Sequence, residues 1–276
     1  MKGRYTWKSM LMELVMILLA VLAVFPVALV IMNSVKSNQQ ILSSILSVPT
    51  EFHWENFANA LEKMNFWPTL RNSLVTTIFS VAGIVLFGSM AAYQLARKKN
   101  VATELIFFVL VLAMTIPFQA LMIPLVIIAG HLGLTNSLPG LILIYIEFSL
   151  PLAIFLYRGA IQSIPRELEE AAMIDGCGPI RCFFLIVFPL IRPMTATIVI
   201  LDALAVFNDF SLPMILISAR EMRTIPLAIS SFFGTYLSDW NLIMAALTIS
   251  VVPVLVFFLT FQKNIMSGLA EGALKG

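Results

Sequence analysis

Ionisable and hydroxyl side chains within apolar stretches are the residues of this sequence best suited to chemistry. Glu147 lies near the middle of one such stretch, and Thr195, Asp202 and Asp209 recur at intervals of seven in another. On a helix this interval keeps the side chains within about 20 degrees of one face and roughly 10 Å apart along the axis. With Asn208 they form a polar stripe that could bond the hydroxyl groups of a hydrated solute or relay a proton.

Other roles for this stripe stay open from the sequence. The side chains could cap helix ends, bond neighbouring helices or meet a second membrane subunit, and Pro213 indicates that the helix ends near Asp209. Intramembrane hydrolysis is a minor alternative, because we expect no serine, cysteine or histidine at depth beside Asp202 or Asp209. All five polar residues are therefore treated as candidates for a translocation path.

The segment from Glu167 to Pro193 differs from the apolar stretches, because it is charged and broken by glycine and proline. Pro165 suits the first turn of a helix, where its missing N–H is not needed. Three acidic side chains then lie near the positive end of the helix dipole: Glu167, Glu169 and Glu170. Gly176, Gly178 and Pro179 are expected to end this first helix.

A second short helix is predicted from about Pro179. A spacing of three and four residues places four apolar side chains on one face of it: Ile180, Phe183, Phe184 and Val187. Pro189 and Pro193 then interrupt the helix. We interpret the two helices as a docking element, because a membrane protein has little reason to keep such a segment in water unless a partner binds it.

The surrounding sequence is that of an integral membrane protein. Of its 276 residues, 60% are hydrophobic and 12% are charged, so a soluble domain of this length could not cover its core with polar surface. Six apolar stretches are long enough to cross a bilayer, which predicts an all-α, polytopic fold with six transmembrane helices. Their approximate bounds are residues 10–32, 74–95, 105–129, 138–157, 193–212 and 240–261.

The placement of basic residues predicts which side of the membrane each segment faces. Six spans put both termini on one side, and twelve of the 17 Lys and Arg residues lie in segments on that side. By the positive-inside rule, the termini and the docking element are cytoplasmic. We expect an anchor span with an external loop at 1–72, a membrane core at 73–262 with a cytoplasmic loop at 159–192, and a cytoplasmic tail at 263–276.

Several kinds of site are absent from the sequence. It has no phosphate-binding Gly-x-x-x-x-Gly-Lys-Ser/Thr loop and no basic segment interleaved with aromatic residues for nucleic acid. Cys177 and Cys182 match no metal or redox spacing, and the only histidines are His53 and His131. We therefore expect no metal, cofactor, disulfide or nucleic-acid partner, and any ATP that drives the protein is bound by another subunit.

Part of the docking element has a distinctive spacing: Glu170-Ala171-Ala172, Gly176, Ile186 and Phe188-Pro189. This pattern resembles the EAA loop of binding-protein-dependent ABC importers, which forms a coupling helix in a cleft of the ATPase subunit. The resemblance implies that Glu170 bonds the ATPase while small residues allow close approach. It assigns seven residues to this interface: Glu170, Ala171, Ala172, Asp175, Gly176, Ile186 and Pro189. Phe188 and Cys177 depart from the family, which usually has Leu and Ala there.

Similarity continues over most of the chain from about Asn56 onward. Among the segments that carry it are Asn72-Ser73-Leu74, Leu132-Gly133-Leu134-Thr135-Asn136-Ser137, Asn208-Asp209-Phe210 and the C-terminal Gly268-Leu269-Ala270-Glu271-Gly272-Ala273-Leu274-Lys275-Gly276. They look like the maltose-type carbohydrate permeases. This resemblance implies the type I ABC importer permease fold, in a bacterial or archaeal inner membrane. It also implies a second, different permease subunit, an ABC ATPase dimer and an extracytoplasmic solute-binding protein.

The implied function is that of a non-catalytic membrane subunit of an ATP-driven importer for oligosaccharides or related solutes. Movement of the docking element switches the spans between inward-facing and outward-facing states. Three alternatives stay open: an ion-coupled secondary transporter that uses Glu147, Asp202 or Asp209, an ABC permease for a non-sugar solute such as a glycerol phosphate, and a scaffold without transport. The energy source of uptake discriminates the first of these from ATP-driven import.

Overall fold

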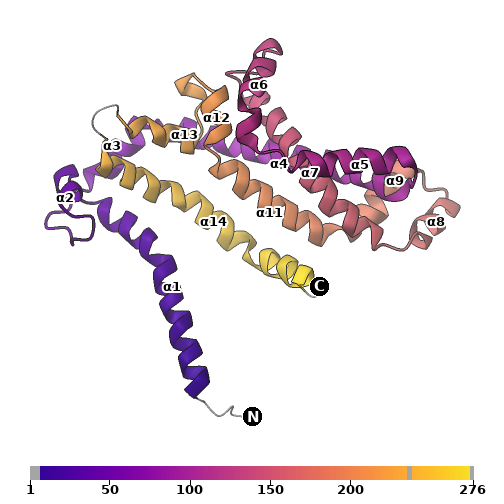
Figure 1. Cartoon of the computed structure of the whole chain (residues 1–276), viewed down its shortest axis with the longest axis horizontal. Coiled ribbons are helices and arrows are strands. Elements are labelled where there is room, and N and C mark those ends of the chain that lie inside the picture. The colour runs from indigo at the N-terminus through magenta and orange to yellow at the C-terminus, as the bar shows by residue number, and fades with distance from the viewer. Residues whose placement is uncertain (1–6, 235–237, 274–276) are drawn as a thin grey trace. The chain divides into compact units, whose positions relative to one another are not determined.

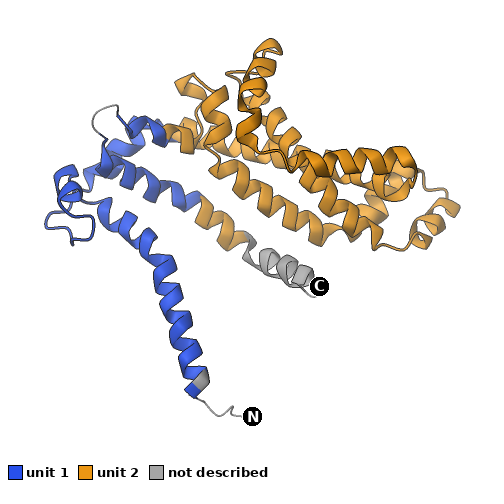
Figure 2. Cartoon of the chain, in the orientation of Figure 1, with its two compact units in different colours: residues 1–66, 229–253 blue, residues 67–228, 254–276 orange. Residues whose placement is uncertain are grey.

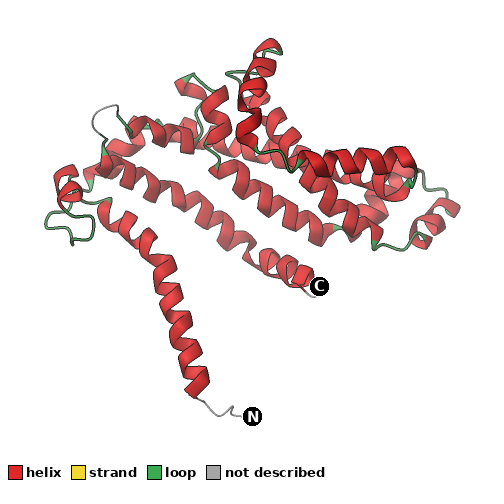
Figure 3. Cartoon of the chain, in the orientation of Figure 1, coloured by secondary structure: helices red, strands yellow, loops and turns green. Residues whose placement is uncertain are grey.

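Helices make up the regular structure of the chain in the computed structural model, which describes residues 7–234 and 238–273 (Figure 3). The prediction of an all-α fold is confirmed. The helices, labelled in Figure 1, are α1 (Trp7–Asn33), α2 (Asn38–Ser43), α3 (Glu55–Lys63), α4 (Phe66–Arg97), α5 (Val101–Ala113), α6 (Phe118–His131), α7 (Leu138–Gln162), α8 (Glu167–Ile174), α9 (Pro179–Cys182), α10 (Phe188–Leu190), α11 (Arg192–Asn208), α12 (Ser211–Leu216), α13 (Ile225–Ile229) and α14 (Trp240–Ala273). A π-helical turn, Phe183–Val187, joins α9 to α10, and short 3₁₀ turns occupy Arg220–Met222 and Ser230–Phe232.

Four helices among the described residues are long and apolar enough to cross a membrane by themselves: α1, α4, α7 and α14. Two further candidates are bent pairs. The helices α5 and α6 meet at 105°, and the segment Pro179–Leu190 meets α11 at 77°. The predicted total of six spans is reached only if each bent pair counts as one span.

The third predicted span, 105–129, is therefore not one continuous helix. The helix α5 ends at Ala113, and α6 begins after Pro117, whose backbone is extended. Proline disfavours helical geometry at the residue before it and has no N–H to continue the hydrogen-bond ladder. Pro124, by contrast, lies inside α6. The predicted end of the fifth span at Leu212 is also wrong, because α11 stops at Asn208.

The chain divides into two compact units, coloured separately in Figure 2. Unit 1 comprises residues 1–66 and 229–253, and unit 2 comprises residues 67–228 and 254–276. Each unit therefore combines segments that are far apart in the sequence. The predicted three-part organisation follows membrane spans rather than packing and stays a prediction.

Unit 1 contains α1 and the two short helices that follow it. Side chains of α1 are exposed from residue 9 to residue 28. After α1 the chain folds around polar groups, and the Nδ2 of Asn56 donates to the carbonyls of Ser34 and Lys36 at 3.0 and 2.9 Å. Lys36 is fully buried, its ammonium donates to the carbonyls of Ser44 and Ile45, and burial lowers its pKa. The predicted surface structure after the first span is thus a small, internally bonded subdomain.

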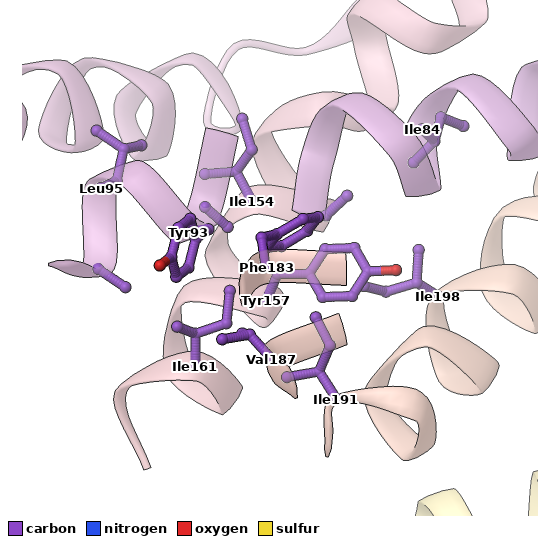
Figure 4. Packing of buried hydrophobic residues seen from close by; sticks show 13 residues of the cluster. Ile84, Tyr93, Leu95, Ile154, Tyr157, Ile161, Phe183, Val187, Ile191 and Ile198 are labelled. Atoms are coloured by element: carbon purple, nitrogen blue, oxygen red, sulfur yellow. The ribbon is translucent and has the colours of Figure 1, made fainter. Parts of the chain in front are cut away.

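Unit 2 is organised by a core between α4 and α7 that also takes in the second half of the docking element and α11 (Figure 4). The buried residues of this core are Ile84, Ala92, Tyr93, Leu95, Ala96, Ala153, Ile154, Tyr157, Ile161, Phe183, Val187, Ile191 and Ile198. A second cluster joins α6, α7 and α12. Within unit 2, α8 and α9 contact each other at one end, and α6 packs with α12 away from them (Figure 1).

Gly88 allows close approach of α4 to α7. A Cβ atom at this position would lie 3.1 Å from the Cβ of Ala153, which is tighter than ordinary van der Waals contact. Small residues at such crossings let membrane helices pack through their backbones. The pair therefore sets the spacing of the two central helices of unit 2.

We expect Gly88→Leu to destabilise the purified protein by about 1–3 kcal/mol, because the larger side chain must push α4 away from α7. Gly159→Leu on α7 is the matched control, since a Cβ there meets nothing within 4 Å. The measurement is the thermal unfolding midpoint of each variant in detergent. Equal midpoints for the two variants would contradict the proposed close packing.

Candidate functional site

The docking element begins with α8, which starts two residues later than Pro165. Its N-cap residue is Arg166, whose carbonyl accepts hydrogen bonds from the N–H groups of Glu169 and Glu170 at 2.9 and 3.0 Å. Pro165 lies outside α8, one residue before the N-cap, so the predicted place of this proline in the first turn is wrong. The three acidic residues do occupy the first turn, where the helix dipole favours negative charge.

Consecutive acidic residues of α8 differ in their exposure to solvent. Glu169 is 5% exposed, whereas Glu170 and Ala171 are exposed, and Ala172 is half-buried. No hydrogen bond or ion pair of the Glu170 carboxylate occurs among the residues that the structure describes. Glu170, which the resemblance assigns to the ATPase, is thus accessible to a partner, whereas Glu169 is not.

The end of α8 is a Schellman turn, in which a left-handed residue lets two N–H groups reach back to helix carbonyls. Gly176 has a φ of +84° and donates its N–H to Met173 O at 3.0 Å, and Cys177 donates to Ala172 O at 2.9 Å. Asp175 is exposed at the C-cap. Because a Cβ at Gly176 would meet nothing within 4 Å inside this chain, the glycine is required here by its backbone conformation.

The second half of the docking element begins at Pro179, as predicted, but its apolar face differs from the prediction. Phe183 and Val187 are buried, whereas Ile180 is 71% exposed and Phe184 is exposed. The N–H of Phe188 bonds to Phe183 O, five residues back, which widens the helix into a π turn. The wider turn shifts the buried positions away from those of a 3.6-residue helix.

Ring contacts and proline explain this wider turn. Pro189 has no N–H, so the helix cannot keep its α-type ladder through this position. Phe183 packs edge-on against Phe184, with ring centroids 4.9 Å apart, and lies 5.9 Å from Phe188. Ile186 and Pro189, both assigned to ATPase docking, are half-buried beside this aromatic cluster.

Sequence reasoning missed the structural role of Glu169. Its carboxylate accepts hydrogen bonds from the hydroxyl of Tyr93 at 2.6 Å and from Nε of Arg97 at 2.7 Å. Its place three residues before Ala172 puts it on the same side of α8 as that half-buried alanine, but the burial of this side is visible only in the structure. A lone glutamate there is ordinarily solvated, so nothing in the sequence pairs it with an arginine 72 positions away.

Two candidates for the translocation path, Thr195 and Asp202, lie on α11 and face α7. The hydroxyl of Tyr157 bonds to Oγ1 of Thr195 at 3.2 Å, and Asp202 is buried in contact with Ser149. The expectation that no serine lies beside Asp202 is therefore wrong. Within the described part of the chain, no group of three or more His, Cys, Asp and Glu residues could hold a metal ion.

Asp209 is separated from this stripe, because it follows the last residue of α11. Its carboxylate accepts the N–H groups of Ser211 and Leu212 at the start of α12 and the hydroxyl of Tyr145 at 2.9 Å. This arrangement matches the helix-capping alternative.

The other two candidates are exposed. The amide of Asn208 donates to the carbonyl of Leu204 one turn earlier in α11. Glu147 is exposed on α7. The structure thus brings together only Thr195 and Asp202 of the five residues predicted to share a path.

A test at position 176 separates backbone conformation from lack of side-chain bulk. Alanine disfavours the left-handed conformation by about 1–2 kcal/mol, whereas asparagine adopts it readily. We expect Gly176→Ala to speed amide hydrogen exchange at positions 175–177 by about fivefold or more, the factor that corresponds to 1 kcal/mol. Gly176→Asn is the control at the same site and is expected to stay closer to the wild type, although it is bulkier. Faster exchange in the asparagine variant than in the alanine variant would contradict this explanation.

Comparison with known proteins agrees with these features. Residues 84–270 match the family model described as the binding-protein-dependent transport system inner membrane component. The probable starch degradation products transport system permease protein AmyC of Thermoanaerobacterium thermosulfurigenes is 38% identical over 260 residues, which cover 94% of each chain. The melibiose/raffinose/stachyose import permease protein MelC of Bacillus subtilis is 35% identical and covers 96% of this chain and 97% of its own.

A solved structure shows the same fold. It is a bacterial ABC transporter involved in the import of the acidic polysaccharide alginate, and one of its chains matches with a TM-score of 0.80 and 22% identity. The match covers 95% of this chain and 99% of that one. By its family match, its relatives and its fold, this chain belongs to the binding-protein-dependent transport system inner membrane components, among the sugar ABC transporter permeases.

Proposed function

We propose that this chain is one of two membrane-spanning subunits of an ATP-driven sugar importer and that α8 is its contact with a separate ATPase. The observation that carries the proposal is the outward face of α8, on which Glu170 and Ala171 are exposed while Glu169 is buried. The same helix exposes Leu168, Met173 and Ile174, the last of them by 87%. Apolar side chains gathered at an exposed tip support a protein partner there.

The chemistry of this face indicates what the ATPase must offer. Glu170 is exposed in the first turn of α8, so we expect a basic group of the ATPase opposite it. Opposite the exposed apolar side chains of α8, we expect the ATPase to have a shallow hydrophobic cleft. Ala172 and Gly176 add little bulk beside this face, which supports close approach of the partner. On this proposal ATP is bound and hydrolysed by the partner, and the chain itself is not an enzyme.

The relatives support an oligosaccharide as the transported solute. The names of these relatives refer to starch degradation products and to melibiose, raffinose and stachyose. All of these are neutral sugars rich in hydroxyl groups, which hydroxyl and carboxylate side chains can bond. Thr195 and Asp202 on α11 are the candidates in this chain that lie together, and Glu147 and Asn208 complete the proposed path from exposed positions.

The remaining partners are a sister permease and an extracytoplasmic solute-binding protein. Exposure of α1 over residues 9–28 supports contact with lipid or with the sister subunit. We place the binding protein on the external segments 33–70 and 218–239, of which residues 235–237 lie outside the described part. The termini are proposed to be cytoplasmic from the distribution of basic residues. The helical course of α14 as far as Ala273 extends into the proposed tail.

Glu170→Ala is expected to weaken ATPase binding by about tenfold or more, as for loss of a central interface residue. The control is Glu167→Ala, which removes an exposed carboxylate from the same helix turn. Both variants are purified from membranes, and the co-purified ATPase and the cellular uptake of radiolabelled raffinose and maltotriose are measured. Equal retention of the ATPase and equal uptake in the two variants would refute the docking role of Glu170.

Asp202→Asn tests the ion-coupled alternative. The amide keeps the size of the carboxylate and its contact with Ser149 but cannot relay a proton. For an ATP-driven importer, we expect uptake by this variant to persist when the ion gradient is collapsed, because an amide still bonds sugar hydroxyl groups. Uptake that survives ATP depletion, fails without the gradient and is lost in the variant would favour a secondary transporter.

A further inference from the structure

Glu169 is the one carboxylate of α8 that is withdrawn from solvent, and it is surrounded by donors from α4. Besides the Tyr93 hydroxyl and Nε of Arg97, Nη2 of Arg97 lies 2.6 Å from the carboxylate. The side chains of Arg97 and Glu169 are 14% and 6% exposed, respectively. Exposed ion pairs contribute little, but breaking a buried pair leaves an uncompensated charge. The connection between α8 and the end of α4 is therefore strong and directional.

A second exchange of bonds joins the end of α4 to the turn before α8. Nη2 of Arg97 donates to the carbonyl of Ile164 at 3.1 Å, and Nη2 of Arg166 donates to the carbonyl of Arg97 at 2.9 Å. The last carbonyls of a helix lack partners within the helix, so Arg166 caps the C-terminus of α4 by bonding one of them. The turn before α8 is therefore bonded to the end of α4 twice: a side chain of α4 donates to the turn, and a side chain of the turn donates to α4.

Tyr93 extends the connection to the second half of the docking element. Its ring lies 5.1 Å from that of Phe183, centroid to centroid, and Figure 4 shows the two rings beside each other in the core. Both residues are buried, so this contact is packed on all sides. One tyrosine therefore contacts α8 through its hydroxyl and the π turn through its ring.

The other end of α4 is also bonded to a distant segment. Nδ2 of Asn72 donates to the carbonyls of Glu221 and Arg223 at 2.7 and 3.1 Å, and Oγ of Ser73 accepts the N–H of Ile225 at 2.8 Å. From residue 72 to residue 97 a straight helix spans about 37 Å, which exceeds the hydrocarbon thickness of about 30 Å. Unlike the bent pairs, α4 is unbroken from Phe66 to Arg97.

We propose that α4 transmits movement of the docking element across the membrane, with Tyr93, Arg97 and Glu169 as the positioning residues at its inner end. Asn72 and Ser73 hold the segment 221–225 at the outer end. This inference rests on the proposed function, because it takes the ATPase as the source of the movement. Displacement of α8 shifts α4 along with it, since a buried ion pair and a packed ring resist separation, and the outer segment follows.

The test uses the assembled complex of permease pair and ATPase in lipid nanodiscs. Amide hydrogen exchange at residues 221–228 is measured with and without ATP and vanadate, together with the amount of bound ATPase. In the wild type and in Glu167→Gln, ATP is expected to change the exchange rate. In Glu169→Gln and Arg97→Gln we expect this change to shrink by about fivefold or more, the lower end of typical coupling between sites, while the ATPase stays bound.

Different results would overturn different claims. An ATP response in Glu169→Gln equal to that of Glu167→Gln, or loss of the ATPase in Glu169→Gln as in Glu170→Ala, would overturn the transmission role. Should Glu169→Gln fail to reach the membrane, Tyr93→Phe decides, because it keeps the ring against Phe183 and removes only the hydroxyl. An unchanged ATP response in Tyr93→Phe then contradicts the inference. A wild-type complex without bound ATPase overturns the proposed function and this inference with it.

Discussion

Glu169 is a charged residue that is only 5% exposed. Three donor atoms from Tyr93 and Arg97 bond its carboxylate and so offset the free-energy cost of burying the charge. Successive residues of a helix are rotated by about 100 degrees, so turning Glu169 inward directs Glu170 toward solvent. The same rotation exposes Ala171 and leaves Ala172 half-buried. A single internal ion pair thus fixes which face of α8 a partner can meet.

Apolar packing alone could not fix that face. Within a membrane the hydrophobic effect does not drive helices together. Close contact of small residues such as Gly88 and Ala153 attracts α4 to α7, but it does little to prevent one helix from sliding along the other. Hydrogen bonds at the helix ends prevent this sliding. The ends of α4 are bonded near residues 72 and 97, and α12 is capped by Asp209, so the apolar core is held in register by groups outside it.

Helix type, the approximate position of the apolar stretches and the glycine-proline stop of the docking element followed from the sequence, because hydropathy and backbone restrictions act locally. The sharp bend before Pro117 did not, since proline in a membrane helix is compatible with a kink or a break and packing decides between them. The buried role of Glu169 was equally hidden, because its partner lies 72 positions away. Asp209 shows a related limit: its interval of seven from Asp202 has meaning only if the helix continues, and α11 ends one residue earlier.

The polar residues of the membrane helices now fall into two groups. Asp209 and Tyr145 are bonded to each other within unit 2, so their polarity is explained without a solute. Glu147 is exposed in the middle of α7, and among the described residues no hydrogen bond or ion pair satisfies its carboxylate. A carboxylate at that depth cannot face hydrocarbon without a large cost in free energy. We infer that this face of α7 meets water or another protein, as a path shared between two permease subunits requires.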